Sequence, residues 1–429
     1  MGNNVISIEE ARASIIEKVS ALPPVTEMVP VLESLGRVIA EDLYSDIDVS
    51  PFNHSAMDGF AVLPADVEAA SEDAPVALRI VAHIGAGDVF DRELASGECI
   101  RIMTGAATPA GVCGVEKIEN VRFAKDAQGT QTPAEGLVGE YALFTAPVAQ
   151  NKNVRMAGEE VKAGELAFEK GMVVQPAGVG LLASTGHLTV PVYKRPKVGL
   201  IINGSELVHA SEVPGPGKIR DSNTWAVSAS VIEAGGIPVA YPIVPDDPEA
   251  IREAYRLAFD ECDVVVSTGV ACLGDFDFAP RVIQEMGELF FTRVSMRPGK
   301  SQPFGMVDGK PVFVLSGNPA ASAVGFEMFA RIALRAMQGY TDFDRPRVKA
   351  RLAIDQKKHE SRVFLQRGIV ERDPEWVEGK DESAYIATPF KKQSSGVYGE
   401  VQRANALIIL PEGARDWQAG EVVECLLMR

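Results

Sequence analysis

Three segments rich in glycine and polar residues could hold a phosphate-bearing ligand. They are Asn203-Gly204-Ser205-Glu206, the stretch 267–277, and Ser316-Gly317-Asn318-Pro319. Glycine lets backbone N–H groups approach phosphate oxygens, and a helix that follows favours an anion at its N-terminus. One such segment alone is more simply explained as a structural turn. Three of them at successive strand ends indicate a phosphorylated ligand, because ligands of open α/β sheets bind at that edge.

Two cations follow in Arg297-Pro298-Gly299-Lys300-Ser301. This stretch is not a Walker A loop, because Val294 stands where the first glycine would be required. Taken alone, Lys300 is better explained as a solvated turn lysine. Beside three polar strand ends, the same two cations would bind anionic oxygens.

Carboxylates suited to proton transfer or to a divalent cation occur at Asp58, Glu206, Asp246 and Asp277. Asp58 stands between small residues and Gly59, which permits a bend open to few other residues. An isolated Asp-Gly pair is usually a polar turn, and Asp246 also has a simpler role as a helix N-cap.

The elements that must position these residues alternate between strand and helix from Pro196 onward. Buried-strand patterns occur at 197–202, 263–267 and 312–315, and Pro319–Met337 has the pattern of a long helix. This alternation predicts a parallel sheet covered by helices on both faces. Residues 60–150 and 348–429 instead show short strand patterns, and Ser7–Glu10 has the pattern of a helix-opening capping box.

Composition narrows the classes of partner. The chain has 429 residues with 42 basic and 59 acidic side chains, for a net charge of −17. That balance argues against binding to nucleic acid or to an anionic membrane surface. We expect no signal peptide and no transmembrane helix, and the five scattered cysteines fit free thiols in a reducing cytoplasm.

The segment Ser55–Ala61 resembles the SAMDG(Y/F)A signature of the molybdopterin molybdenumtransferases, the MoeA family, which includes the E domains of gephyrin. Further segments resemble that family in order along essentially the whole chain. They are RIMTG at 101–105, Asn153–Glu159 (N-(I/V)-R-x-x-GE), Asn203–Leu207 (TGDEL), Ile219–Asn223 (I-x-D-(S/T)-N), Val244–Pro248 (V-x-D-D-P), RPGK at 297–300 (KPGK), SGNP at 316–319 (PGNP), Gln366-Arg367 (QR) and Gln393–Ser395 (QGS).

The resemblance implies a multidomain α/β plus β fold, an elongated chain of four domains. A central three-layer α/β domain with a parallel sheet would bind molybdopterin. The implied bounds are 1–50 with 151–195 for a mixed helical domain, 51–150 for an inserted β-domain, 196–342 for the α/β domain and 346–429 for a C-terminal β-domain.

The implied activity is the insertion of molybdate into adenylylated molybdopterin with release of AMP. The implied catalytic carboxylates are Asp58, Glu160, Glu206, Asp246 and Asp277, with Asp246 and Asp277 on Mg²⁺. The implied substrate-binding residues are Thr104, Arg155, Ser205, Arg293, Arg297, Lys300, Ser316, Asn318, Pro319, Arg367 and Ser395. The resemblance also implies a homodimer with an active site shared between subunits, and the molybdopterin adenylyltransferase as a partner.

Departures from the family pattern fall among these residues. Glu160 replaces an aspartate, Val270 and Cys272 alter a GGVS loop, and Arg293 and Arg297 replace lysines. An arginine is planar and bidentate, and it does not donate its proton as a lysine does. Two alternatives therefore stand beside the leading activity. They are a paralogue that uses tungstate or a variant pterin, and a non-catalytic protein that binds molybdopterin or acts as a scaffold.

Overall fold

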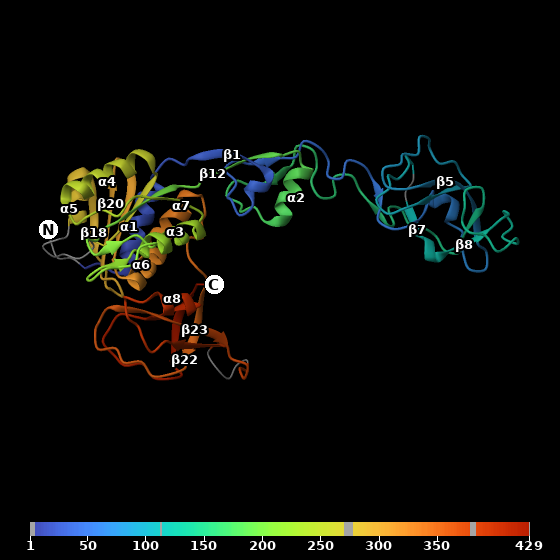
Figure 1. The fold of residues 1–429 in the computed structure, drawn as a ribbon. Helices are drawn as coiled ribbons and strands as arrows, with labels where there is room; N and C mark the ends of the chain where they lie inside the picture. Colours follow the sequence, from blue (N-terminus) through green and yellow to red (C-terminus); the bar gives the residue numbers. More distant parts are fainter. Residues whose placement is uncertain (1–4, 112–113, 270–277, 378–382, 429) are drawn as a thin grey trace. The chain divides into compact units, whose positions relative to one another are not determined.

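The computed structural model describes residues 5–111, 114–269, 278–377 and 383–428 (Figure 1). The chain forms two compact units. The first contains Met1–Met28 and Pro191–Arg429, and the second contains Val29–Val190. The chain passes between the units in strands β1 (Thr26–Pro30) and β12 (Thr189–Tyr193), which pair with each other.

A six-stranded sheet forms the centre of the first unit. Its order is β16 (Ile237–Ala240), β13 (Lys197–Ile202), β17 (Val264–Thr268), β21 (Lys310–Leu315), β20 (Ser301–Val307) and β18 (Glu288–Arg293). The first four strands run parallel, as the sequence predicts.

The expectation of a parallel sheet is wrong at one edge, where β20 runs antiparallel to both of its neighbours, β21 and β18. The reason is the two-residue turn Asp308-Gly309, in which both residues have positive φ, 49° and 75°. Such a turn matches the twist of a tight antiparallel hairpin. The sheet is therefore mixed.

Helices cover both faces of this sheet. Successive side chains of a strand point to opposite faces, so Val198 and Leu200 join one core cluster while Ile201 joins the other. The helices α1, α3, α6 and α7 contribute to the first cluster, and α4 and α5 to the second. Their bounds are α1 Ile8–Ser20, α3 Asn223–Glu233, α4 Pro248–Glu261, α5 Phe278–Met286, α6 Pro319–Gly325 and α7 Arg331–Met337. The predicted three-layer α/β arrangement is confirmed.

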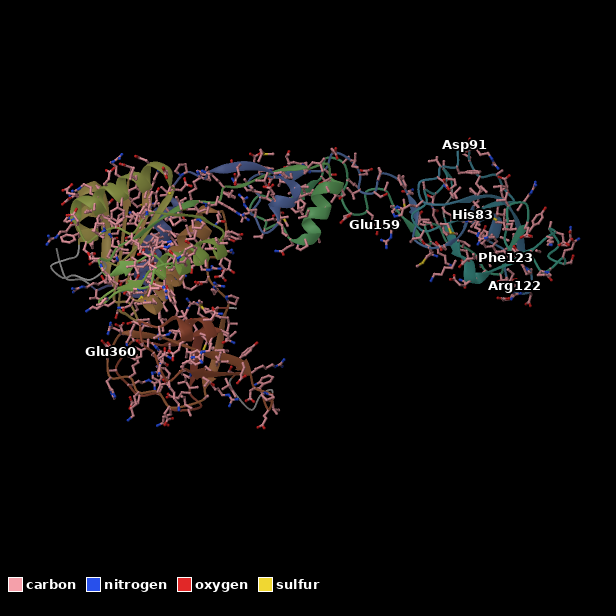
Figure 2. All side chains as sticks on the ribbon, viewed as in Figure 1. His83, Asp91, Arg122, Phe123, Glu159 and Glu360 are labelled. Carbon is pink, nitrogen blue, oxygen red and sulfur yellow. The ribbon has the colours of Figure 1, made fainter. Side chains whose placement is uncertain are left out.

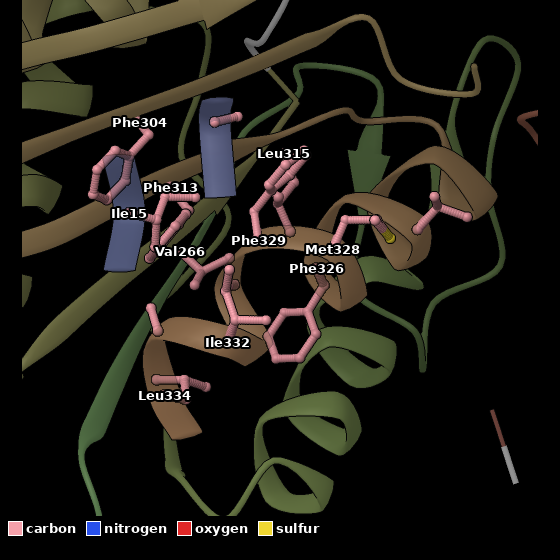
Figure 3. Packing of buried hydrophobic residues seen from close by; sticks show 14 of the residues in the cluster. Ile15, Val266, Phe304, Phe313, Leu315, Phe326, Met328, Phe329, Ile332 and Leu334 are labelled. Atoms are coloured by element: carbon pink, nitrogen blue, oxygen red, sulfur yellow. The ribbon is translucent and has the colours of Figure 1, made fainter. Parts of the chain in front are cut away.

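The long helix expected at Pro319–Met337 is present as α6, a π-helical turn at Phe326–Ala330, and α7. Every residue of the π turn is buried. Figure 3 shows Phe326, Phe329 and Ile332 within the apolar cluster beneath the sheet. The helix that follows the SGNP loop is thus anchored along its length.

Helix α1 begins with the predicted capping box, in which Glu10 N donates to Ser7 Oγ (3.1 Å) and Ser7 N to Glu10 Oε2 (2.8 Å). Its buried residues Ile15 and Val19 belong to the first unit's core. The sequence groups residues 1–50 with 151–195. In the structure, however, α1 packs in the α/β part of the first unit, because its apolar face is buried in that core. The four domain boundaries stay predictions.

The end of the chain forms a closed five-stranded barrel in the first unit. Its strands pair in the ring β23–β24–β22–β26–β25–β23, and β19 (Met296–Arg297) adds in parallel to β23. The bounds are β22 Arg347–Leu352, β23 Val363–Arg372, β24 Tyr385–Pro389, α8 Tyr398–Arg403, β25 Ala406–Leu410 and β26 Val422–Leu427. Strand β19 thus belongs to the barrel sheet although it precedes β20 of the central sheet in the chain.

The second unit contains a six-stranded sheet in the order β7–β4–β6–β5–β9–β8. The bounds are β4 Gly59–Val62, β5 Val76–Ile84, β6 Glu98–Ile102, β7 Gly114–Lys117, β8 Val121–Ala124 and β9 Tyr141–Phe144. The rest of the unit contains α2 (Pro176–Ser184) and two short strand pairs. These are β2 (Leu43–Tyr44) with β11 (Leu166–Phe168), and β3 (His54–Ser55) with β10 (Val154–Arg155). In the described part of the chain, no helix has the length and apolar character needed to cross a membrane.

Candidate functional site

The three polar strand ends meet at one edge of the central sheet. Strands β13, β17 and β21 are neighbours, and their carboxyl ends lead into the three loops. A Cβ added at Gly269 (φ 113°) would lie 2.0 Å from Asn203 O, and one at Gly317 would lie 3.1 Å from Gly269 Cα. Only glycine permits the approach at position 269, and the approach at Gly317 is close enough that a larger residue would shift its neighbour. The remainder of the second loop, with Val270, Cys272 and Asp277, lies outside the described residues.

A cavity of about 320 Å³ opens at the polar edge of the central sheet. Another cavity of the same unit, of about 360 Å³, has mainly apolar residues in its lining. Five of the predicted substrate-binding residues line the polar cavity: Arg293, Lys300, Ser316, Asn318 and Ser395. They come from β18, the RPGK turn, the SGNP loop and the barrel. Pro319, also predicted, is the first residue of α6 directly after Asn318. The fold therefore gathers residues that are far apart in the sequence.

Hydrogen bonds join the barrel to the polar edge of the sheet. Ala320 N donates to Ser395 O (2.8 Å), and Tyr398 Oη donates to Asn223 Oδ1 (2.8 Å). The Asn223 amide in turn donates to Gly317 O (2.9 Å) and to Thr268 Oγ1 (3.2 Å). Since Asn223 is only 7% exposed, each of these bonds is costly to lose. The network fixes the position of the barrel loop that carries Ser395.

A smaller cavity of about 190 Å³ lies on the other side of the RPGK turn and is lined by Arg297, Lys357 and Arg367 among others. Arg367 is 1% exposed, and its guanidinium donates to Ser394 O (2.9 Å) and lies 3.7 Å from Glu400. Burial lowers the pKa of Arg367. The structure therefore shows Arg367 holding the Gln393–Ser395 loop.

Arg297 is half exposed and already has a carboxylate partner. Its NH1 donates to Glu360 Oε1 (2.6 Å), and its guanidinium lies 4.9 Å from the centre of the Phe364 ring. Glu360, labelled in Figure 2, also accepts from Arg362. Burial raises the pKa of Glu360, but the hydrogen bonds from Arg297 and Arg362 outweigh it and hold that pKa below its usual value. Glu360 is therefore charged at neutral pH.

Lys300 differs from Arg297. It is exposed at the polar cavity of about 320 Å³, and within the described residues no carboxylate pairs with it. Val294 N donates to its backbone oxygen (2.9 Å), which fixes the turn. An ammonium group held in this way is available to an anionic ligand.

The loop after β13 brings Ser205, Glu206 and Asp246 together. Asp246 Oδ2 accepts from Ser205 N (3.0 Å), while the N-cap of α4 is Asp247, whose side chain accepts from Ala250 N (2.9 Å). The simpler N-cap explanation of Asp246 is therefore wrong, since its neighbour does that work. Asp246 faces the strand-end loop and remains a candidate for chemistry.

The described residues alone do not form a complete binding site for a metal ion. They contain no group of three or more His, Cys, Asp or Glu side chains that could hold one. Mg²⁺ commonly takes one or two carboxylates and completes its shell with water and substrate phosphates. Asp246, one of the two predicted ligands, fits that pattern, and the other, Asp277, lies outside the described residues.

In the second unit, the predicted site residues Asp58 and Thr104 contact each other. Thr104 donates to Asp58 Oδ1 through its backbone N (2.8 Å) and its hydroxyl (2.7 Å). These two bonds, the backbone one first, lower the pKa of Asp58. The side chain is exposed, so it is a charged carboxylate open to solvent.

The two other predicted residues of the second unit are also exposed. Arg155 lies on β10 opposite His54 of β3, and it pairs with Glu159 at 3.5 Å (Figure 2). Glu160 donates its backbone N to Val49 O (3.2 Å). The short β3–β10 pair thus places Arg155 opposite His54, four residues before Asp58 in the sequence. Their roles stay predictions.

Sequence reasoning missed the supports of the first unit's site. Asn223 lies in a quoted motif, and a polar residue at the start of a helix was the available signal. Tyr398 and Glu360 gave no signal, because each acts through a partner that is distant in the sequence.

Family comparisons cover the chain in three parts. The MoeA N-terminal region (domain I and II) matches residues 6–186, a probable molybdopterin binding domain matches 199–336, and the MoeA C-terminal region (domain IV) matches 349–428.

Individual relatives match over nearly the full length. A molybdopterin molybdenumtransferase of Staphylococcus aureus (strain COL) is 33% identical over 99% of this chain and 96% of its own length. That of Bacillus subtilis (strain 168) is 34% identical over 94% and 90%. The crystal structure of the molybdopterin biosynthesis MoeA protein of Pyrococcus horikoshii OT3 is 30% identical with a TM-score of 0.79, over 99% of this chain and 100% of that one. With three family regions matched in order and full-length relatives above 30% identity, the chain belongs to the MoeA family.

Proposed function

We propose that this chain inserts molybdate into adenylylated molybdopterin and releases AMP in molybdenum cofactor biosynthesis. The observation that carries the proposal is the polar cavity of the first unit, where Arg293, Lys300 and Ser395 converge from separate elements. Relatives matched over nearly their whole length are named for this transfer. The substrates it requires are the pterin nucleotide and an oxyanion.

Within that cavity, Lys300 and Arg293 supply positive charge, and Ser316 and Ser395 supply hydroxyl groups. Charge-assisted hydrogen bonds of this kind hold phosphate or molybdate oxygens. Arg297 contributes from the adjoining cavity. Arg367 contributes indirectly, through the loop to which it donates a hydrogen bond.

Glu206 and Asp246 act at the neighbouring loop. Bound Mg²⁺ would neutralise phosphate charge and polarise the phosphoanhydride that is cleaved. Asp246, oriented by Ser205 N, would hold that ion, and Glu206 would take up or return the proton that accompanies exchange of oxygen on the oxyanion. A requirement for Mg²⁺ is tested by the loss of AMP release in a chelator and its return when Mg²⁺ is added.

The test of the activity is AMP release from adenylylated molybdopterin with molybdate present or absent. We expect release to depend on molybdate in the wild type and to fall strongly in Asp246→Asn, with little change in melting temperature. Binding of the pterin without AMP release at any molybdate concentration would contradict the proposal and favour a non-catalytic molybdopterin-binding or scaffold protein.

We further propose a homodimer in which Asp58 of one subunit serves the Glu206 site of another. Leu32, Leu35 and Leu188 support an interface, because they are exposed and Val31 N bonds to Leu188 O (2.9 Å). Mixing Asp58→Asn and Glu206→Gln subunits should restore about a quarter of the sites, since half the chains pair as heterodimers with one intact site. No restoration after confirmed subunit exchange would refute a shared site, and a single 45.9 kDa species in sedimentation would refute the dimer.

A second candidate, a preference for tungstate or a variant pterin, rests on Arg293 and Arg297 in place of lysines. We expect Arg297→Lys to change the ratio of apparent affinities for molybdate and tungstate, because a planar guanidinium and a compact ammonium present donors differently. An unchanged ratio with full activity would mean that the arginines are ordinary sequence divergence without an effect on selectivity. The buried free thiols Cys99, Cys262 and Cys425 support a cytoplasmic location, where the molybdopterin adenylyltransferase would deliver the substrate.

A further inference from the structure

Glu360 holds two arginines by different oxygens. Arg297 NH1 donates to Glu360 Oε1 (2.6 Å), whereas Arg362 Nε donates to Glu360 Oε2 (2.7 Å) and its NH2 donates to the same oxygen. If Arg297 left this carboxylate, Glu360 Oε2 would still accept two hydrogen bonds from Arg362. Release of Arg297 therefore does not leave a half-buried charge uncompensated.

The two arginines differ in how firmly they are held. Arg362 is 29% exposed and also donates to Met296 O (3.3 Å), which ties it to strand β19. Arg297 is 52% exposed, and among its hydrogen bonds to described residues only that to Glu360 is charged. Arg297 also lines the smaller cavity of the candidate site, so its guanidinium has a second place to go.

The loop that carries Glu360 is fixed by a buried lysine. Lys358 is 1% exposed and its Nζ donates to Glu360 O (3.0 Å), to Ser361 O (3.4 Å) and to Gly413 O. A buried ammonium group is costly to leave without hydrogen bonds, so the three backbone oxygens that accept from Lys358 are held in place. The Glu360 carboxylate therefore stands at a defined position beside Arg297.

We propose that Glu360 is a built-in counter-ion that competes with the oxyanion for Arg297 and so sets the oxyanion affinity of the site. The inference rests on the proposed function, which places an oxyanion within reach of Arg297. In the resting protein Arg297 binds Glu360, and in the complex it turns to the oxyanion while Arg362 keeps the carboxylate. Competition of this kind keeps binding weak enough for the oxyanion to enter and exchange, and Lys300 provides first capture.

The test is calorimetric titration of the full-length protein with molybdate. Glu360→Gln preserves shape and removes the competing charge, so we expect molybdate to bind on the order of 3- to 10-fold more tightly. The matched control is Glu412→Gln, which removes a nearby carboxylate that accepts from Ser295 Oγ (3.0 Å) and not from Arg297. We expect no more than a marginal gain there.

A second variant covers the case in which Glu360→Gln is unstable. Glu360→Asp keeps the charge and the contact with Arg362 but shortens the reach to Arg297 by one methylene, so molybdate binding should tighten here too. If Glu360 instead served to orient Arg297 for the oxyanion, both variants would bind molybdate more weakly. Weaker or unchanged binding in the two variants overturns the proposal.

A double-variant comparison localises the effect. In an Arg297→Gln background, Glu360→Gln should no longer tighten binding, because the contested guanidinium is absent. A gain of the same size in that background would overturn the proposal. Molybdate-dependent AMP release by the wild type is measured in parallel. Its absence refutes the proposed function, whereas its presence with the wrong order of affinities refutes only the role of Glu360.

Discussion

The candidate residues of the two units are held in different ways. In the first unit, the loop that carries the ligand-facing Ser395 is held by the buried Asn223 and the partly buried Tyr398. In the second unit, Asp58 is exposed and receives both of its hydrogen bonds from one residue, Thr104. Buried polar groups are costly to leave unpaired, whereas exposed ones regain water. Substitutions among the supports of the first unit should therefore change stability strongly, and substitutions at Asp58 or Thr104 should change it only slightly.

The largest effect is expected at Lys300, which separates the ligand-facing groups from their supports. Lys300→Gln should weaken molybdate binding about 10- to 100-fold, because one charge-assisted hydrogen bond is lost. Its melting temperature should stay near that of the wild type, since no carboxylate among the described residues depends on it. Titration calorimetry and a thermal melt measure both quantities.

The control for this variant is Lys349→Gln, an exposed lysine on β22 that lines neither cavity of the site. An equal loss in both variants would show that the overall charge of the protein, and not Lys300, governs binding. In that case Lys300 would have no specific role in binding molybdate.

An intermediate effect is expected at Tyr398, one of the supports. Tyr398→Phe removes the 2.8 Å bond to Asn223 Oδ1 and should cost about 1–2 kcal/mol of unfolding free energy. Molybdate binding should weaken less than in Lys300→Gln, because the barrel loop loosens but every ligand-facing group remains. Chemical denaturation measures the stability.

The matched control is Tyr385→Phe, at a tyrosine that is 37% exposed. It should leave stability within a few tenths of a kcal/mol of the wild type, as expected for surface substitutions. Equal stability of the two variants would mean that the bond between barrel and sheet contributes nothing, and the contrast between the units would fail.

The smallest effect is expected at Thr104. Thr104→Val removes the hydroxyl donor but keeps the backbone donor, so the lowered pKa of Asp58 should rise part of the way to its ordinary value. Because the folded pKa lies below the unfolded one, this contact stabilises the fold at higher pH. That contribution is lost as the pH falls through the folded pKa. In the variant this contribution should be smaller, and its loss should be complete at a higher pH.

An NMR titration of the carboxyl groups checks this result and contains its own control. Asp126 has the same arrangement, with Thr130 donating through its backbone N (2.8 Å) and its hydroxyl (2.7 Å). Its lowered pKa should not respond to Thr104→Val. A shift of Asp126 together with Asp58 would point to a general change in the unit.

Parts of the site that depend on neighbouring residues in the sequence could be predicted, and parts that depend on residues far apart in the sequence could not. Glycine-rich strand ends are local patterns, so the sequence predicts the three loops, while Lys300, Ser316 and Ser395 are implied by the family motifs that contain them. The hairpin at Asp308-Gly309 is also a local pattern, but the alternation of strands and helices alone does not predict it. Asp246 and Asp247 are equivalent as N-caps in sequence, and only geometry shows which one caps α4.

Other features could not have been found in this way. The Tyr398–Asn223 bond joins residues 175 positions apart, and Arg297 meets Glu360 across 63 positions. Such contacts depend on how the barrel packs against the sheet, which no spacing in the sequence encodes. The burial of Arg367 likewise follows from the closure of the barrel and gives it a role as a support of the Gln393–Ser395 loop beside its predicted role in binding.

The central claim, that the first unit holds the oxyanion between the RPGK turn, the SGNP loop and the barrel, is tested most directly by locating the anion. Crystals soaked in tungstate would give a strong anomalous signal from the metal. We expect one main peak within hydrogen-bonding reach of Lys300, with Ser316 and Ser395 beside it, and its loss in Lys300→Gln. A main peak elsewhere, or one unchanged in Lys300→Gln, would contradict it.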